Sequence, residues 1–169
     1  VGADSELIHD TLEAARSAQA LTTQLLSFSK GGKPVKKEIC FGKARREIFS
    51  LATRGCAAAQ ELAVAEELWS VEGDENQLKQ AVNNILLNGI QSMPSGGTIS
   101  LKAENIGETD QVPPPLQPGK YVKVTVSDSG IGIPAQYLPR IFEPYFTTKT
   151  KGHGLGLPMV WSVIKNHSG

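Results

Sequence analysis

The N-terminal stretch carries a repeating apolar pattern that is typical of a long helix packed in a bundle. Its most regular apolar positions recur every seven residues: Leu7, Ala14, Leu21 and Phe28. Because a wide apolar stripe on a helix must be covered by another helix, the pattern predicts a helix over 5–29 that packs with a second chain or with a missing helix. A helix folded back on its own domain is the alternative. The Gly and Pro residues of 30–34 predict the end of this helix and a hinge.

Beyond the hinge, the pattern predicts an α+β domain with helices on one face of a sheet. Alternating apolar runs predict strands over 35–40, 62–71, 98–105 and 121–128. A helical period predicts helices over 43–59, 74–93 and 155–166. Asp74 is expected to cap the second of these helices, with Gln77 three residues later. Residues 130–153 show no sustained period, and an irregular segment of that length is typical of a functional lid.

Composition narrows the possible partners. The 169 residues carry 17 Lys and Arg against 17 Asp and Glu, so no basic excess favours nucleic acid. Cys40 and Cys56 have no paired spacing and predict neither a disulfide framework nor a metal site. No apolar run approaches the roughly 20 residues that span a bilayer. We therefore expect this stretch of chain to be cytoplasmic, without nucleic-acid binding or membrane contact.

The helix predicted over 74–93 carries a candidate metal site. Asn84 and Asn88 lie one turn apart on a largely polar stripe beside the apolar face, so their amides are expected to point the same way. Neutral amide oxygens suit a magnesium ion that also binds phosphate oxygens and water. A solvated polar face is the alternative for this stripe taken alone.

The strand predicted over 121–128 ends in a candidate purine site. Alternation puts Asp128 on the apolar face of the strand, and a carboxylate aimed into a core needs a donor. The exocyclic amine of adenine is such a donor. Gly130 and Gly132 follow, and they would let the backbone approach a flat base. A tight turn capped by the aspartate is the alternative.

The last predicted helix is preceded by glycines that favour phosphate binding. Gly152, Gly154 and Gly156 lie before or at the helix start, where amides and the positive end of the helix dipole attract anions. The stretch is neither a Rossmann turn nor a Walker loop. Just upstream, an aromatic cluster over 142–146 is expected to pack the lid, and hydroxyls and a cation over 147–149 are expected to reach a phosphate.

Taken in order, these four elements resemble the N, G1, F and G2 boxes of the histidine kinase ATPase domain. The matching stretches are 80–93, 128–133, 142–149 and 152–157. The resemblance implies a two-layer α/β sandwich of the histidine kinase and Hsp90 (Bergerat) type, with ATP and Mg²⁺ as ligands and Asn88 as the metal ligand. The ATP-binding residues that it implies are Asn84, Asn88, Asp128, Gly130, Gly132, Ile133, Phe146, Thr147, Thr148, Lys149, Gly152, His153, Gly154, Leu155 and Gly156. In two places the chain departs from the family: Gly89 replaces the usual Ala, and Gln91 stands where many members have a charge.

Residues 1–30 resemble the second helix of the dimerisation bundle of nitrogen-sensor-type kinases. The resemblance divides the chain into a partial bundle (1–30), a hinge (31–34) and a catalytic ATP-binding domain (35–169) whose last strands are expected beyond Gly169. The first bundle helix, which carries the phosphoacceptor histidine in the family, is not in this sequence. His9, which is followed by Asp10, is an alternative acceptor, but it lies on what resembles the second helix and is interpreted as a bundle or surface histidine. His153 and His167 are poor acceptors. No catalytic residue is therefore assigned.

The resemblance implies an ATP-dependent protein-histidine kinase of a two-component system. It would act as a homodimer through the bundle helix and pass phosphate on to a response regulator receiver domain, with a membrane anchor left open for the full-length protein. Three alternatives remain at this level. They are a nucleotide-binding module without transfer, a structural dimerisation protein, and an ATPase of the gyrase, Hsp90 and MutL type, which the F-box-like segment disfavours.

Overall fold

The computed structural model describes residues 11–12, 34–40, 49–50, 53, 56–108, 110, 112–149 and 152–169. The chain divides into two compact units, Val1–Lys33 and Pro34–Gly169. Most of the helix predicted over 5–29 lies outside the described residues. Within that range only Thr11 and Leu12 are described, and both are helical. In the described part of the chain, no helix has the length and apolar character needed to cross a bilayer. The elements that position the candidate site all belong to the second unit.

The second unit contains a sheet of three strands and a sheet of two. The larger sheet consists of Ala59–Val64 (β2), Thr98–Ile106 (β4) and Tyr121–Asp128 (β5). Its order is β2-β4-β5, with β2 parallel to β4 and β5 antiparallel to β4. The smaller sheet pairs two antiparallel strands, Lys37–Ile39 (β1) and Val71–Gly73 (β3). The strands predicted over 98–105 and 121–128 are therefore confirmed to within a residue.

The single strand predicted over 62–71 is wrong. The structure has two strands in this part of the chain, β2 and β3, which belong to different sheets. Glu66 and Glu67 form a turn between them. Asn105 of β4 holds this connection, because its Oδ1 accepts from Trp69 N at 2.9 Å and its Nδ2 donates to Glu67 O at 2.7 Å. The alternation of apolar residues over 62–71 therefore includes a turn, and this turn is stabilised by the side chain of Asn105 from β4.

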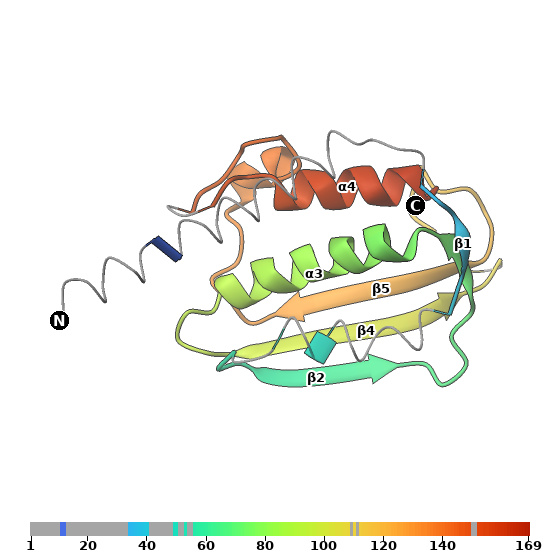
Figure 1. Ribbon diagram of the computed structural model, residues 1–169, viewed down its shortest axis with the longest axis horizontal. Coiled ribbons are helices and arrows are strands. Elements are labelled where there is room, and N and C mark those ends of the chain that lie inside the picture. Colours follow the sequence, from blue (N-terminus) through green and yellow to red (C-terminus); the bar gives the residue numbers. More distant parts are fainter. Residues whose placement is uncertain are drawn as a thin grey trace. The chain divides into compact units, whose positions relative to one another are not determined.

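Two helices lie on one side of the larger sheet. They are Glu75–Gln91 (α3) and Gly156–Asn166 (α4). Figure 1 shows α3 lying over β4 and β5, with α4 packed on the side of α3 that faces away from the sheet. This arrangement confirms the predicted α+β class and the helix layer on one face of the sheet.

Two further predictions need correction. The helix predicted over 43–59 was placed too far along the chain at its end, because Ala59 already begins β2. Residues 49–50 are helical, and residues 41–48 lie outside the described part. The lid segment, predicted as irregular, contains the 3-10 helix Ala135–Arg140 (η1).

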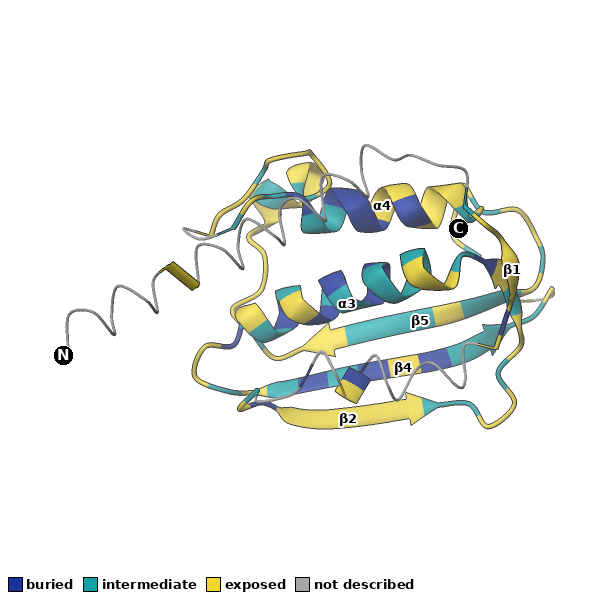
Figure 2. Ribbon diagram, viewed as in Figure 1, coloured by how far each residue is buried: buried dark blue, intermediate teal, exposed yellow. Residues whose placement is uncertain are grey.

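The core lies between the sheet and α3, and it continues between α3 and α4 (Figure 2). Alternate residues of β4 point toward α3 and are almost fully buried: Ile99, Leu101 and Ala103. From α3, Leu86 has no exposed surface and packs in the same cluster. On the other side of α3, Ala81 packs against three residues of α4: Met159, Val160 and Val163. Because α3 is buried on two sides, its position relative to β5 and α4 is well determined by packing.

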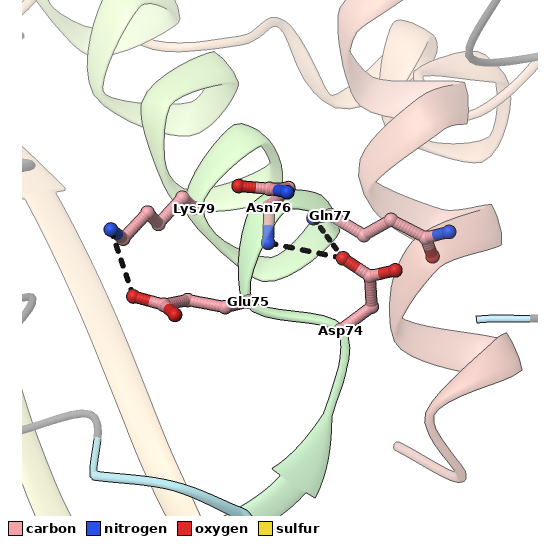
Figure 3. Close-up of polar contacts among 5 residues, drawn as sticks. All are labelled: Asp74, Glu75, Asn76, Gln77 and Lys79. Carbon is pink, nitrogen blue, oxygen red and sulfur yellow. Dashed lines mark hydrogen bonds and ion pairs between the residues drawn. The ribbon is translucent and has the colours of Figure 1, made fainter. Parts of the chain in front are cut away.

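Asp74 caps α3 as predicted (Figure 3). Its Oδ1 accepts from Asn76 N at 3.1 Å and Gln77 N at 3.2 Å, and its Oδ2 accepts from Val35 N at 3.2 Å. Glu75 and Lys79, one turn apart, form an ion pair at 2.9 Å. The cap therefore joins the start of α3 to the segment that leads into β1.

His167 joins the end of α4 to the start of α3. Its Nε2 accepts from Asp74 N at 2.9 Å, and its Nδ1 lies 2.7 Å from Val163 O. Both contacts are satisfied by a neutral ring that carries its proton on Nδ1. In a capping box the side chain three residues after the cap would bind the cap N–H, and here His167 takes that bond instead. His167 is thus a structural residue between the two helices.

Candidate functional site

Asp128 ends β5 and lies beside the C-terminal end of α3. Strand register pairs it with Ile99 of β4, and a Cβ at Gly89 of α3 would lie 3.4 Å from its Oδ2. The carboxylate is therefore on the face of the sheet that α3 covers, the same face as Val124 and Val126, which pack on the core. The predicted face is right. The expectation of a carboxylate aimed into the core is wrong, because Asp128 is exposed at the end of its strand.

Two polar groups contact one oxygen of Asp128. Ser92 Oγ lies 2.8 Å from Asp128 Oδ1, and Gly130 N donates to the same oxygen at 2.9 Å. A Cβ at position 130 would overlap Ser92 Oγ and come within 2.8 Å of Asp128 Oδ1. Glycine at 130 is therefore required by this packing, whatever it does for a ligand. Ser92 is not among the predicted site residues, because a serine at a helix end gives no signal until the fold brings it to Asp128.

Gly132 and Ile133, which also belong to the predicted purine site, are accessible to solvent or have open space around them. Gly132 has a φ of +71° with open space where a side chain would be, and Ile133 is 51% exposed. A residue other than glycine would be strained in this backbone conformation. The turn after β5 therefore leaves backbone and an apolar side chain accessible next to Asp128.

Asn84 and Asn88 lie one turn apart on α3 but have different surroundings. Asn84 is buried between α3 and α4, where its Nδ2 lies 3.4 Å from Met159 Sδ. Asn88 is half-buried beside the start of α4, since a Cβ at Gly156 would lie 3.6 Å from its Nδ2. Of the two amides, Asn88 is the one that reaches the lid. A nucleotide contact by Asn84 stays a prediction.

Lys149 of the lid places its ammonium on the end of α3. Its Nζ donates to Asn88 Oδ1 at 3.0 Å and to Gln91 Oε1 at 2.8 Å. Partial burial lowers the pKa of Lys149, and the negative charge of Asp128 opposes this lowering. Asn88 and Gln91 are three residues apart on one side of the helix, so both oxygens face the same ammonium. The Lys149 ammonium is thus bound to Asn88 Oδ1, the oxygen that was predicted to bind a metal.

Main-chain hydrogen bonds hold the lid next to the start of α4. Tyr145 N donates to Gly154 O at 2.9 Å, and Gly152 N donates to Lys149 O at 3.3 Å. Thr147 Oγ1 accepts from Lys149 N at 3.1 Å, and a Cβ at Gly152 would come within 2.6 Å of that hydroxyl oxygen. The glycines therefore permit a close turn that brings Thr147 and Lys149 near α4.

Aromatic contacts pack the lid against η1 and α4. The ring of Phe146 lies 5.7 Å from that of Tyr137, and the Arg140 guanidinium lies 4.4 Å from the Phe146 centroid. Phe142 contacts Trp161 of α4 at 5.1 Å between ring centroids. These contacts, worth about 0.5–1.5 kcal/mol each beyond burial, pack the lid against η1 and the middle of α4.

Two of the remaining predicted residues lie at the start of α4. Leu155 is buried at the N-cap position, Gly156 begins the helix, and no side chain of the described residues caps it. Thr148 and His153 are exposed. His9 lies outside the described residues. The structure therefore brings Asp128, Asn88 and Lys149 together at one end of α3, with the uncapped amides of α4 beside them.

Comparison with known proteins identifies relatives of this arrangement. Residues 73–169 match the family described as histidine kinase-, DNA gyrase B-, and HSP90-like ATPase. Sensor kinase CckA of Brucella abortus (strain 2308) is 36% identical over 162 residues, which cover 92% of this chain and 17% of that protein. Sporulation kinase A of Bacillus subtilis (strain 168) is 44% identical over 99 residues, which cover 59% of this chain and 14% of that protein. This chain thus spans about a sixth of the length of these relatives.

The fold has close counterparts among solved structures. The mycobacterial sensor histidine kinase MprB superposes with a TM-score of 0.63 at 27% identity, over 79% of this chain and 80% of that chain. The region that matches the family model begins at the residue before Asp74 and runs to Gly169, so it includes α3, α4 and the lid between β5 and α4.

Proposed function

Because this chain belongs to the histidine kinase-, DNA gyrase B-, and HSP90-like ATPase family, we propose that it is the ATP-binding catalytic domain of a sensor histidine kinase, preceded by part of a dimerisation bundle. The domain binds ATP with Mg²⁺ and passes the γ-phosphate to a histidine on the bundle. From there the phosphate goes to the receiver domain of a response regulator. The names of the relatives, which are sensor and sporulation kinases, support the kinase class.

The observation that carries this proposal is the way Asp128 is held. Ser92 and Gly130 both contact Oδ1, and Oδ2 is the atom that we assign to the exocyclic amine of adenine. A carboxylate that is held by the Gly130 amide and contacts the Ser92 hydroxyl, which also lies 2.7 Å from Gly89 O, does not have to reorganise when the purine arrives. The exposed Ile133 and the backbone of Gly132 lie next in the chain and are available to contact the flat base.

The phosphates are assigned to the first turn of α4 and to the lid. Amides at a helix N-terminus carry partial positive charge and bind anions, and those of α4 have no side-chain cap among the described residues. The lid adds Thr147, Thr148 and Lys149, while Gly152, Gly154 and Gly156 let the backbone come close. Leu155 and Phe146 support this segment by packing, and His153 lies on its exposed side.

Asn88 fits the role of magnesium ligand. Its Oδ1 already faces a cation, the Lys149 ammonium at 3.0 Å, and a neutral amide oxygen is a suitable hard ligand. When bound, the metal ion neutralises charge on the phosphates. The residues of this chain then act by positioning: Asp128 orients the purine, the α4 amides and Lys149 orient the phosphates, and little covalent chemistry is asked of the protein.

The wider setting is also a proposal. Residues 1–30 would supply one helix of the bundle through which two copies associate, and the phosphoacceptor would lie on a bundle helix outside this sequence. We expect a cytoplasmic location for this domain. No role in nucleic-acid binding is proposed, because the charges of the chain are balanced.

The test measures nucleotide binding and phosphoryl transfer separately. Calorimetry with ATP and Mg²⁺ should give a defined affinity for the wild-type chain and a loss of about tenfold or more in Asp128→Asn. Asp110→Asn is the matched control, since Asp110 accepts from Gly107 in the β4–β5 loop, at the opposite end of the sheet. Its affinity should equal that of wild type.

Transfer is then tested with labelled ATP and a separately prepared histidine-bearing bundle. We expect label on the bundle in a form that is lost in acid, as for phosphohistidine. Binding with release of inorganic phosphate alone would indicate an ATPase rather than a kinase. A wild-type chain that binds no nucleotide would refute the proposal.

A further inference from the structure

The contact between Lys149 and α3 links two parts of the chain that no short-range signal connects. Lys149 lies 61 residues from Asn88 and 58 residues from Gln91, and its ammonium donates to both amide oxygens. An ammonium group can only donate, so the two amides must present their oxygens to it. This pair of oxygens therefore forms a cation position at the end of α3, and the protein fills it with its own side chain.

Filling this position affects how a metal reaches Asn88. An ammonium 3.0 Å from the Asn88 oxygen competes with Mg²⁺ for that oxygen, because two cations that share one ligand oxygen repel each other. Gln91 is different: it is exposed at the last residue of α3, outside the set of ATP and metal residues, and its oxygen holds Lys149 at 2.8 Å. Because Gln91 is neutral, it can hold the ammonium without cancelling its charge.

We infer that Lys149 serves as a resident cation on Asn88 before nucleotide binds, and that Gln91 is the positioning residue that keeps its ammonium beside α3 when Asn88 turns to the metal. The retained ammonium then meets the terminal phosphate, so the Gln91–Lys149 pair favours ATP over ADP. This inference rests on the proposed function and assigns to Gln91 a role in nucleotide discrimination.

The geometry supports this sequence of contacts. The backbone of Lys149 is tied down independently of its ammonium, because its N–H donates to Thr147 Oγ1 and its carbonyl accepts from Gly152 N. The ammonium can therefore leave Asn88 without opening the lid turn. Gln91 lies one helical turn beyond Asn88, so a shift of Nζ toward Gln91 frees the Asn88 oxygen while one hydrogen bond remains.

The alternative explanation is that Lys149 is an exposed lysine whose contacts with the Asn88 and Gln91 oxygens have no functional role. Exposed polar contacts of that kind contribute little, and removing them would leave nucleotide preference unchanged. The two explanations therefore differ in a measurable quantity, the ratio of ATP to ADP affinity.

The experiment compares variants of the full chain by calorimetry with ATP and with ADP, each with Mg²⁺. Lys149→Met and Gln91→Met should each lower the ATP to ADP affinity ratio, Lys149→Met by about tenfold. Gln91→Lys added to Lys149→Met should restore the preference, because a lysine at 91 can place an ammonium in the same space. Lys102→Met is the control, since Lys102 pairs with Glu104 on the exposed face of the sheet.

A second readout uses no nucleotide. Titration with Mg²⁺ alone, followed by the NMR signals of the Asn88 side-chain amide, should perturb those signals at lower Mg²⁺ in Lys149→Met than in wild type. An unchanged ATP to ADP ratio in Lys149→Met, or identical Mg²⁺ titrations, would overturn the inference while leaving the proposed function intact. Failure of the wild-type chain to bind either nucleotide would overturn both.

Discussion

Gly154 offers a test of how the lid turn is built. Its φ is +65°, and a Cβ there would overlap Tyr145 C and lie 2.6 Å from Phe146 O and 2.7 Å from Phe146 N. These neighbours are backbone atoms, which cannot rotate away. Gly132 is a matched control, because it has nearly the same φ, +71°, but open space where its Cβ would be.

The two substitutions separate the cost of backbone conformation from the cost of close contact. Alanine in the left-handed region costs about 1–2 kcal/mol at either position. Overpacking adds about 1–3 kcal/mol at Gly154 alone. We therefore expect Gly154→Ala to lower the free energy of unfolding by about 2–5 kcal/mol, and Gly132→Ala by about 1–2 kcal/mol.

Urea unfolding of both variants measures the difference, provided that the dependence on urea concentration is unchanged. If the lid opens locally instead of straining, the loss in global stability will be smaller. Hydrogen exchange will then be faster at the Tyr145 amide, which donates to Gly154 O at 2.9 Å. Equal stability of the two variants together with unchanged exchange at Tyr145 would refute the reasoning.

Three further predictions concern other parts of the domain. Asp74→Ala should destabilise the domain by about 1–2 kcal/mol in urea unfolding through loss of the cap, and a loss near zero would contradict this. Ser92→Ala should weaken binding of ATP by freeing the Asp128 carboxylate, so unchanged affinity in a competition assay would count against its role. The pKa of Glu104 is lowered chiefly by the hydrogen bond from Lys102, and its stabilising effect is therefore present above the pKa of the unfolded chain and lost as pH falls through the folded value. Lys102→Ala should raise the Glu104 pKa toward its ordinary value in an NMR titration, and no change would exclude Lys102 as the cause.

Local patterns account well for the elements around the site. The alternation of Ile99, Leu101 and Ala103 predicts a strand with one buried face, and Asp74 before an amphipathic run predicts a helix start. Both depend on neighbours within one or two turns, which the sequence displays directly. The strand predicted over 62–71 was wrong because the turn at Glu66 and Glu67 is stabilised by Asn105, a residue of another strand.

The candidate site was predictable in its residue types but less so in its contacts. Helical spacing places Asn84 and Asn88 on one side of α3, yet the packing of α4 buries Asn84 against Met159 and leaves Asn88 at the lid. Spacing could not reveal the Lys149 contact either, because it depends on how the lid returns to α3. Contacts of this kind are properties of the tertiary fold.

The most direct test is a crystal structure of the full chain with Mg²⁺ and a non-hydrolysable ATP analogue. The account predicts the adenine amine within hydrogen-bond distance of Asp128 Oδ2, the metal on Asn88 Oδ1, and Lys149 Nζ turned from Asn88 to the terminal phosphate while still in contact with Gln91. An analogue bound away from Asp128, or an Asp128 carboxylate directed into solvent in the complex, would contradict it.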